Sequence, residues 1–295
     1  MSIQQTEQQR YERITKRSAT SAKLMMTILW IVLLGGAILF TMPLWIMSTM
    51  SLKTPGEIAS TAAWSWPKVI TWDNFKEVLN NENAPFYMFF RNTLFISTIV
   101  TIGVCGSAAM VAYAFARLRW RGRDRLFLLL LSTMMLPWMV TTIPSYIMFA
   151  KLHWVDTFLP LTVPAFFGGG AFNIFLLRQF FMGIPRELDE AALLDGAPHS
   201  VIFWKILVPN SLPALTTVGI FTFIGAWKDF MGPLIYLNDP NKQTLELGLR
   251  TYQSLHNEQW NLIMAGAVLV MIPLIVIFIL GQRYFVKGIV MSGLK

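Results

Sequence analysis

Six long apolar stretches divide this chain and leave it few ways to fold. They run over residues 24–47, 92–115, 126–149, 159–181, 211–236 and 261–282. A bilayer core of about 30 Å is crossed by about 20 helical residues, and in lipid only helices and closed barrels satisfy every backbone polar group. The sequence therefore predicts an all-α, polytopic membrane protein with six transmembrane helices.

The scarcity of charge supports a membrane protein. Only 14% of the residues are charged, whereas soluble domains carry about 25%. The first apolar stretch is too long for the core of a signal peptide, and no convincing cleavage site follows it. We therefore expect a cytoplasmic N-terminal segment over residues 1–23 and a membrane domain over residues 24–295.

The positions of the basic residues predict the orientation. Five basic residues lie in the segment before the first span. Five more lie in residues 117–125, between the second and third spans. Three more lie from Arg178 to the fifth span, and three lie in the C-terminal tail, whereas the alternate loops hold three, one and two. Cytoplasmic loops are enriched in Lys and Arg. Both termini are therefore expected in the cytoplasm, and the net charge of +8 needs no nucleic-acid partner.

Several spans contain residues that disturb a helix. Pro137 and Pro144 are expected to kink the third span. The run Gly168-Gly169-Gly170 in the fourth span either allows close helix packing, the commoner case, or loosens the helix beside a cavity. Lys228 and Asp229 in the fifth span are costly at the bilayer centre, so they either face a cavity or extend toward the outer surface.

Two features outside the spans and one cysteine complete the local predictions. Phe75 to Leu79 is expected to form a short surface helix, with a partly ordered loop as the alternative. Cys105 lies among small residues and is expected to be an inert packing residue. The histidines His153, His199 and His256 show no metal-ligand spacing.

The polar segment from Pro185 to Pro209 reads as a helix, a break and a second helix. Acidic residues near the start of the first helix suit its positive end, and Gly196 suits a left-handed cap. Pro198 can begin the second helix. The apolar face of that second helix consists of Ile202, Phe203 and Ile206.

The spacing within this segment resembles the cytoplasmic EAA loop of bacterial ABC-importer permeases. The matching residues are Glu190, Ala191, Ala192, Gly196, Ile206 and Pro209, and Val208 replaces a usual leucine. The resemblance implies that the loop docks into a separate ATPase subunit, with Asp195 also in the coupling set. Glu190 would provide an anchor charge, and the two alanines would allow close approach. Without the resemblance, an ordinary surface helical hairpin remains the alternative.

Other segments resemble the second permease subunit of maltose-type importers. They are residues 92–97, 112–117, 172–181, 225–237 and 282–288. Two departures are Lys228, where that branch is expected to have asparagine, and Lys295, after which a glycine is expected. The resemblance implies a type I ABC-importer permease fold, a paralogous permease subunit, two ATPase subunits and an extracytoplasmic sugar-binding protein. ATP and Mg would belong to the ATPases, because this chain has no phosphate-binding loop motif and is expected to bind no cofactor.

The expected function is import of a sugar, an oligosaccharide or disaccharide, into the cytoplasm. Candidate substrate-pathway residues are Asn173, Trp227, Lys228 and Asp229, although the resemblance allows the paired subunit to make most or all substrate contacts. An ion-coupled secondary transporter is the alternative, with Asp229 as the intramembrane acid. A membrane enzyme is disfavoured, because the apolar stretches hold no histidine and no paired acids.

Overall fold

The chain folds almost entirely into helices. The computed structural model describes residues 3–81, 85–254 and 257–292. The only strands in that part of the chain are β1 (Gln253–Ser254) and β2 (Asn257–Glu258), which pair antiparallel. The α-helices are α1 (Ile3–Ser51), α2 (Pro55–Ser60), α3 (Asp73–Asn80), α4 (Phe86–Ala116), α5 (Arg123–Ser132), α6 (Trp138–Lys151), α7 (Leu159–Thr162), α8 (Ala171–Gly183), α9 (Glu187–Leu194), α10 (His199–Val201), α11 (Val208–Asn210), α12 (Leu212–Trp227), α13 (Met231–Tyr236), α14 (Leu245–Gly248) and α15 (Trp260–Ser292). Short 3-10 segments are η1 (Thr133–Met135), η2 (Val163–Phe166), η4 (Pro240–Lys242) and η5 (Leu249–Tyr252), and η3 (Ile202–Leu207) is a π-helix.

Four segments of the described chain are long and apolar enough to cross a membrane. They are Met25–Ser51, Phe86–Ala116, Leu159–Gly183 and Trp260–Gln282. The number rises to six only if each of two sharply bent helix pairs counts as one span. The all-α fold is confirmed, and the short helix expected near Phe75 is α3. The prediction of six spans therefore depends on the two bent pairs.

The third predicted span is not one kinked helix. Its two halves, α5 and α6, meet at 98° across the break before Pro137. Leu136 is extended, with ψ of 117°, because a residue before proline avoids the helical region. Pro144 lies inside α6. The kink expected at Pro137 is thus corrected to a break, whereas Pro144 lies within α6 and a kink there stays a prediction.

The fourth span is interrupted at its three glycines. Gly168, Gly169 and Gly170 have φ of 102°, 67° and 85°, which end the helical path between η2 and α8. A Cβ added at Gly169 would lie 2.7 Å from the carbonyl oxygen of Val104 and 2.8 Å from Cβ of Ala108. The glycines therefore interrupt the helix and allow close packing against α4, which was the commoner of the two expected cases.

The fifth predicted span is also interrupted. Helix α12 ends at Trp227, and α13 begins at Met231 after a short break. At its other end, α12 follows the helical segment His199–Asn210 across a bend of 77° at Ser211. A single helix over residues 211–236 is therefore wrong, because the chain turns at Lys228 to Phe230.

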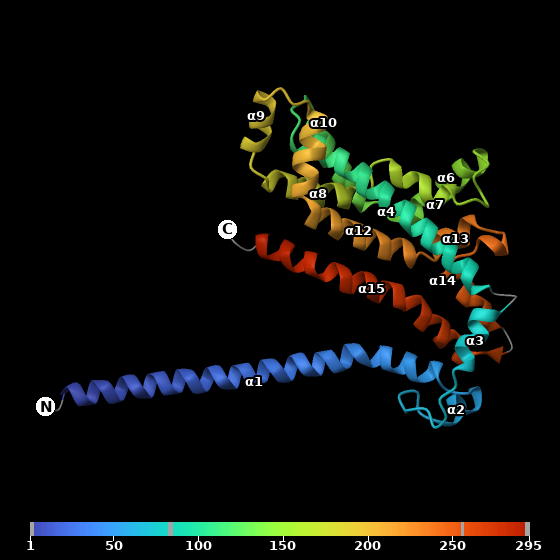
Figure 1. The fold of residues 1–295 in the computed structure, drawn as a ribbon, viewed down its shortest axis with the longest axis horizontal. Helices are drawn as coiled ribbons and strands as arrows, with labels where there is room; N and C mark the ends of the chain where they lie inside the picture. Colours follow the sequence, from blue (N-terminus) through green and yellow to red (C-terminus); the bar gives the residue numbers. More distant parts are fainter. Residues whose placement is uncertain (1–2, 82–84, 255–256, 293–295) are drawn as a thin grey trace.

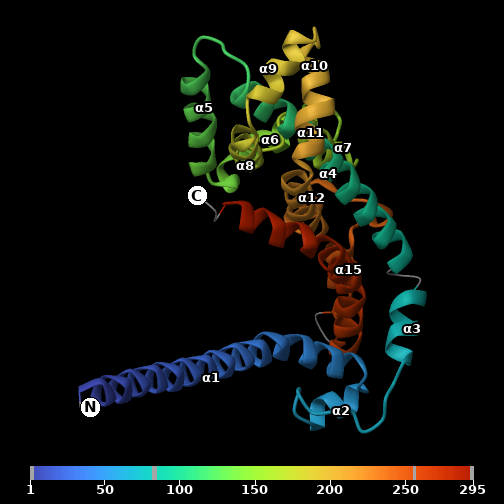
Figure 2. The ribbon, with the colours of Figure 1, turned by 60° about the vertical axis from the view of Figure 1, so that its left-hand side comes forward.

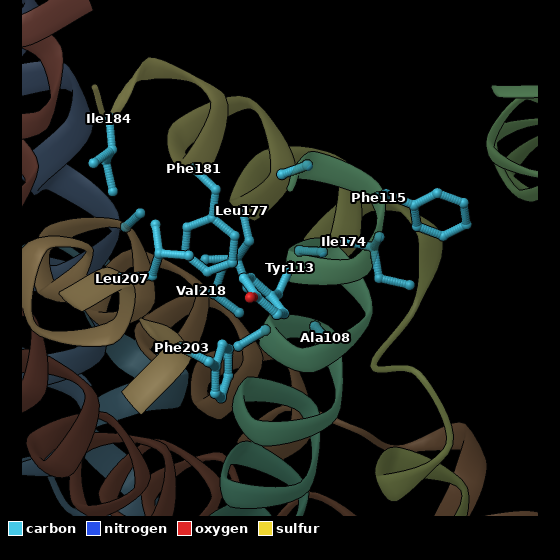
Figure 3. Packing of buried hydrophobic residues seen from close by; sticks show 14 of the residues in the cluster. Ala108, Tyr113, Phe115, Ile174, Leu177, Phe181, Ile184, Phe203, Leu207 and Val218 are labelled. Atoms are coloured by element: carbon cyan, nitrogen blue, oxygen red, sulfur yellow. The ribbon is translucent and has the colours of Figure 1, made fainter. Parts of the chain in front are cut away.

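Two apolar clusters hold the bundle together. The first joins α4, α8, η3 and α12, and Figure 3 shows Tyr113 and Phe203 among Leu177, Phe181 and Leu207. The second joins α3, the start of α4, the end of α12, α14 and α15, with Trp227 fully buried in it. Helices α4 and α12 contribute residues to both clusters, so each of them is packed at both of its ends.

The bundle has two distinct ends (Figures 1 and 2). Helices α9 and α10 lie at one end, which we call the α9 end, and the start of α1 and the end of α15 point the same way. Helices α2, α3, α13 and α14 lie at the opposite end, which we call the α3 end. The described parts of the segments predicted to be cytoplasmic thus gather toward one end.

Candidate functional site

The segment 185–209 folds as a capped helix followed by a second helical run. Gly196 takes φ of 77°, and its N–H donates to the Leu193 carbonyl at 3.0 Å. The N–H of Ala197 donates to the Ala192 carbonyl at 2.9 Å. This pair of bonds is the Schellman motif that ends helices at a left-handed residue. Pro198 then caps the next helix, so the predicted helix–break–helix arrangement is confirmed.

Helix α9 has an inward face and an outward face. Asp189 and Ala192, three residues apart, face the bundle, as helical spacing requires. Leu188, Ala191 and Leu194 repeat at the same spacing on the exposed side, and Leu194 is 89% exposed. A helix with an exposed apolar stripe at a polar end of the molecule is suited to contact another protein.

An ion pair fastens α9 to the end of α4. Arg117 Nε lies 3.2 Å from Asp189 Oδ2, and these side chains are 4% and 14% exposed. Arg117 Nη2 also donates to the Ile184 carbonyl at 2.9 Å. Burial raises the pKa of Asp189, and the positive charge of Arg117 opposes that rise. From the sequence, Arg117 was counted only among the basic residues that set the membrane orientation. Nothing local in the sequence shows that α9 packs against the end of α4.

The second helical run is anchored in the first apolar cluster. Ile202 and Phe203 are buried and Ile206 is half-buried against it, as the sequence predicted. The Tyr113 hydroxyl lies 3.0 Å from His199 Nδ1, and its ring packs 5.4 Å from that of Phe203. Residues 202–207 form a π-helical turn, a feature frequent at functional sites.

A pocket of about 270 Å³ lies between α9 and these anchors. Its lining includes Arg186, Glu190 and Leu193, together with the ion pair. Arg117 Nη1 and Asp189 Oδ1 are buried there without a hydrogen-bond partner. Buried polar atoms in folded proteins are nearly always paired. The pocket therefore offers an unused donor and an unused acceptor beneath the EAA residues.

Lys228 and Asp229 meet at the α3 end. Both border a pocket of about 520 Å³ that Trp138 and Tyr236 also line. Asp229 also borders a second pocket of about 250 Å³, and its Oδ1 accepts the Gly232 N–H at 3.1 Å. The two neighbours share one pocket because α12 ends just before them. Both side chains line a pocket, and Lys228 is also exposed at this end of the bundle, so the structure is compatible with both alternatives from the sequence.

Trp227 and Asn173 lie elsewhere and have structural contacts. The Trp227 indole N–H donates to the Val270 carbonyl at 3.2 Å, and its ring packs against Phe90 and Phe223. Asn173 Nδ2 donates to the Gly169 carbonyl at 2.8 Å and so braces the glycine break. The structure brings together only Lys228 and Asp229 of the four substrate-pathway candidates, and substrate contact by any of them stays a prediction.

The part of the chain that the structure describes offers no metal-ligand set. No group of three or more His, Cys, Asp or Glu side chains gathers there. Cys105 is half-buried, with Sγ 3.9 Å from the Leu215 carbonyl, where α4 meets α12. With its four to six candidate membrane spans, the fold defines a polytopic helical membrane protein with an exposed helix suited to contact another protein.

Comparison with known proteins places this subunit in a family. The family model described as "Binding-protein-dependent transport system inner membrane component" matches residues 102–291. The arabinooligosaccharides permease AraQ of Halalkalibacterium halodurans is 32% identical over 78% of this chain and 81% of its own length. The sn-glycerol-3-phosphate permease UgpE of Yersinia pestis is 31% identical over 89% and 95%, and the probable ABC transporter permease YurM of Bacillus subtilis is 30% identical over 91% and 88%.

Solved structures agree with the family. One chain of a bacterial ABC transporter that imports the acidic polysaccharide alginate superposes with a TM-score of 0.78 at 25% identity, over 88% of this chain and 96% of that chain. A chain from the alginate transporter in complex with its pentasaccharide-bound periplasmic protein gives 0.61 at 14% identity, over 92% and 96%, and shows the fold alone. This chain belongs to the inner-membrane permease components of binding-protein-dependent ABC importers, as a multi-pass, non-catalytic subunit of the second-permease type.

Proposed function

We propose that this subunit imports a sugar, an oligosaccharide or disaccharide, into the cytoplasm. It pairs with a paralogous permease subunit, two ATPase subunits that hold ATP and Mg, and an extracytoplasmic sugar-binding protein. Support comes from relatives whose names specify arabinooligosaccharides, and from the alginate transporter whose chain has a similar fold. The relative named for sn-glycerol-3-phosphate shows that the same family accepts a smaller, anionic cargo.

The construction of α9 carries this proposal. Its outward stripe of Leu188, Ala191 and Leu194 is exposed, whereas its inward face is bound to α4 through Asp189. An ATPase that binds this exposed stripe would move α9, and the contact of Asp189 with α4 would pass that movement to the rest of the bundle. Glu190 borders the pocket at the edge of this surface, where it would supply the anchor charge.

Two routes carry the movement from the loop into the spans. The first runs through Arg117 to α4, and the second runs from Phe203 through the π-helical turn to α12. Asp195 and Gly196 form the cap between them, and Ile206 and Pro209 lie in the second route. Closure of the ATPases would thus tilt α4 and α12 and switch the pathway between inward- and outward-facing states.

The proposal also assigns an orientation. An ATPase is cytoplasmic, so the α9 end faces the cytoplasm, and with it both chain termini and the loop 117–125. The α3 end then faces the binding protein. The pocket at Lys228 and Asp229 lies on that side, and these two side chains can hydrogen-bond sugar hydroxyls while the buried Trp227 positions the end of α12.

Two variants test the proposal. Glu190→Lys and Gly196→Pro should abolish sugar uptake and release the ATPase during gentle solubilisation, while the subunit stays in the membrane. Gly183→Ala is the matched control, because a Cβ there meets nothing within 4 Å and no positive φ is required. Normal uptake in both variants, or a purified subunit without any ATPase, would contradict the proposal.

A further inference from the structure

Five arginines converge on one pocket beside the start of α9. The pocket has a volume of about 810 Å³, and we call it the arginine pocket. It is lined by Arg119, Trp120, Arg121, Gly122, Arg123, Asp124, Arg125 and Arg186. The first seven belong to the loop after α4 and to the start of α5, whereas Arg186 comes from the segment before α9. Topogenic charge explains why arginines occur in a cytoplasmic loop, but it does not explain their convergence with Arg186.

Most of this positive charge is uncompensated. Asp124 is the acid in the lining, and its Oδ1 is already 2.9 Å from Arg123 Nε. Arg119, Arg121, Arg125 and Arg186 are exposed, and none of them forms an ion pair within the described residues. A concave site with several free guanidinium groups favours a ligand that carries phosphate oxygens.

The surface next to the pocket is apolar. Arg125, Leu128 and Leu129 share one side of α5 by helical spacing, and both leucines are largely exposed. The opposite side is packed, because Phe127 is buried beneath the Arg178 guanidinium at 4.1 Å. Trp120 is 40% exposed at the pocket rim, and tryptophan is enriched at membrane interfaces.

We propose that the arginine pocket binds the headgroup of an anionic phospholipid whose acyl chains lie along Leu128 and Leu129. Charge above an exposed apolar helix face is the arrangement that a lipid requires, and basic pockets on the cytoplasmic side of membrane proteins suit anionic headgroups. Arg186 is the N-cap residue of α9 and directly precedes its first residue. A bound lipid would therefore bridge the loop after α4 to the coupling helix; this step and the cytoplasmic position of the pocket rest on the proposed function.

Native mass spectrometry of the purified full-length chain tests the binding. The probe is phosphatidylglycerol, with phosphatidylcholine and inorganic phosphate in separate arms. Each basic residue near an anionic membrane contributes about fivefold in affinity, so Arg121→Gln with Arg125→Gln should weaken phosphatidylglycerol binding roughly 25-fold. The double variant Arg91→Gln with Lys151→Gln, at exposed sites remote from the pocket, should leave binding unchanged.

A charge-preserving variant separates lipid binding from membrane insertion. Arg121→Lys with Arg125→Lys keeps the topogenic charge but loses the planar fork of guanidinium, so it should insert normally and bind several-fold more weakly. Equal binding of phosphatidylglycerol by the glutamine variant and the unmodified chain would overturn the proposal. Displacement of the lipid by millimolar inorganic phosphate would overturn it in favour of a free-anion site. If the glutamine variant lost a co-purifying ATPase while its lipid binding was unchanged, the proposal would be overturned in favour of a protein-binding surface.

Discussion

Arg117 Nε lies 3.2 Å from Asp189 Oδ2 and thereby joins the residue that caps α4 to helix α9. The two residues are far apart in the sequence and both side chains are nearly buried. Arg117 Nε and Nη1 and Asp189 Oδ1 are all buried without a hydrogen-bond partner, so the Nε–Oδ2 contact is an ion pair and not a hydrogen bond. The contact is therefore an attachment whose hydrogen bonding is incomplete.

Separating this ion pair should damage the protein more than removing it. Arg117→Gln or Asp189→Asn alone leaves one buried charge unpaired, which costs about 3–5 kcal/mol. The double variant should unfold at a temperature between those of the single variants and the unmodified chain. The unfolding temperature of the unmodified chain, the two single variants and the double variant is measured in detergent. The exposed ion pair of Lys76 and Asp73 is the control, and its removal should change the unfolding temperature little. If the losses of stability in the two single variants simply added in the double variant, the prediction would be contradicted.

Gly169 should tolerate no side chain. Gly169→Ala places a Cβ 2.7 Å from the Val104 carbonyl oxygen and forces alanine into φ of 67°. The left-handed conformation alone costs about 1–2 kcal/mol, so we expect a lower unfolding temperature and reduced uptake. Gly106→Ala, on α4 with nothing within 4 Å, is the matched control. Equal unfolding temperatures for these two variants would show that the α4–α8 approach is looser than the structure indicates.

Substitution of Trp227 should reduce stability, whereas substitution of Asp229 should affect substrate uptake. Trp227→Ala empties a fully buried site and should cost about 3–5 kcal/mol, with protein yield falling. Asp229→Asn keeps an oxygen for the Gly232 N–H, so stability should change little while the Michaelis constant for sugar uptake rises severalfold. Unfolding temperature and uptake kinetics are measured together. An unchanged Michaelis constant in Asp229→Asn would remove that carboxylate from the pathway.

The connection between Asp156 and the segment after α13 should weaken in acid. Asp156 Oδ1 accepts the N–H groups of Asp239 and Asn238 at 2.9 and 3.0 Å, and Lys242 lies 3.2 Å from Oδ2. These bonds, the backbone ones foremost, hold the pKa of Asp156 below its usual value. The stabilisation is present above the usual pKa of about 3.9 and is lost as pH falls through the lower folded value.

Thermal unfolding between pH 6 and pH 3 measures this effect. The unmodified chain should lose more stability than Asp156→Asn, because asparagine keeps an acceptor oxygen but does not titrate. Identical pH profiles for the two proteins would show that Asp156 contributes nothing to the acid response.

The local structure of residues 185–209 was predictable because its signals are local. The acids at the start of α9, the left-handed Gly196 and the apolar side of the following helix all depend on neighbours within one or two turns. The interruptions at Pro137 and at Gly168 to Gly170 were located correctly, but their size was not. A proline or glycine permits a bend, whereas the packing partner sets its angle, as the contact of Gly169 with α4 illustrates.

By itself, the sequence determined that this chain is helical and membrane-bound, where its polar loops lie, and that residues 185–209 form a helix, a glycine cap and a second helix. Hydropathy, charge placement and helix capping act over short stretches of chain. Only the tertiary structure decided that Arg117 reaches Asp189, that Trp227 is buried while its neighbours Lys228 and Asp229 line a pocket, and that Arg186 joins the arginines of another loop. Those relationships depend on how distant helices pack, and no spacing along the chain records them.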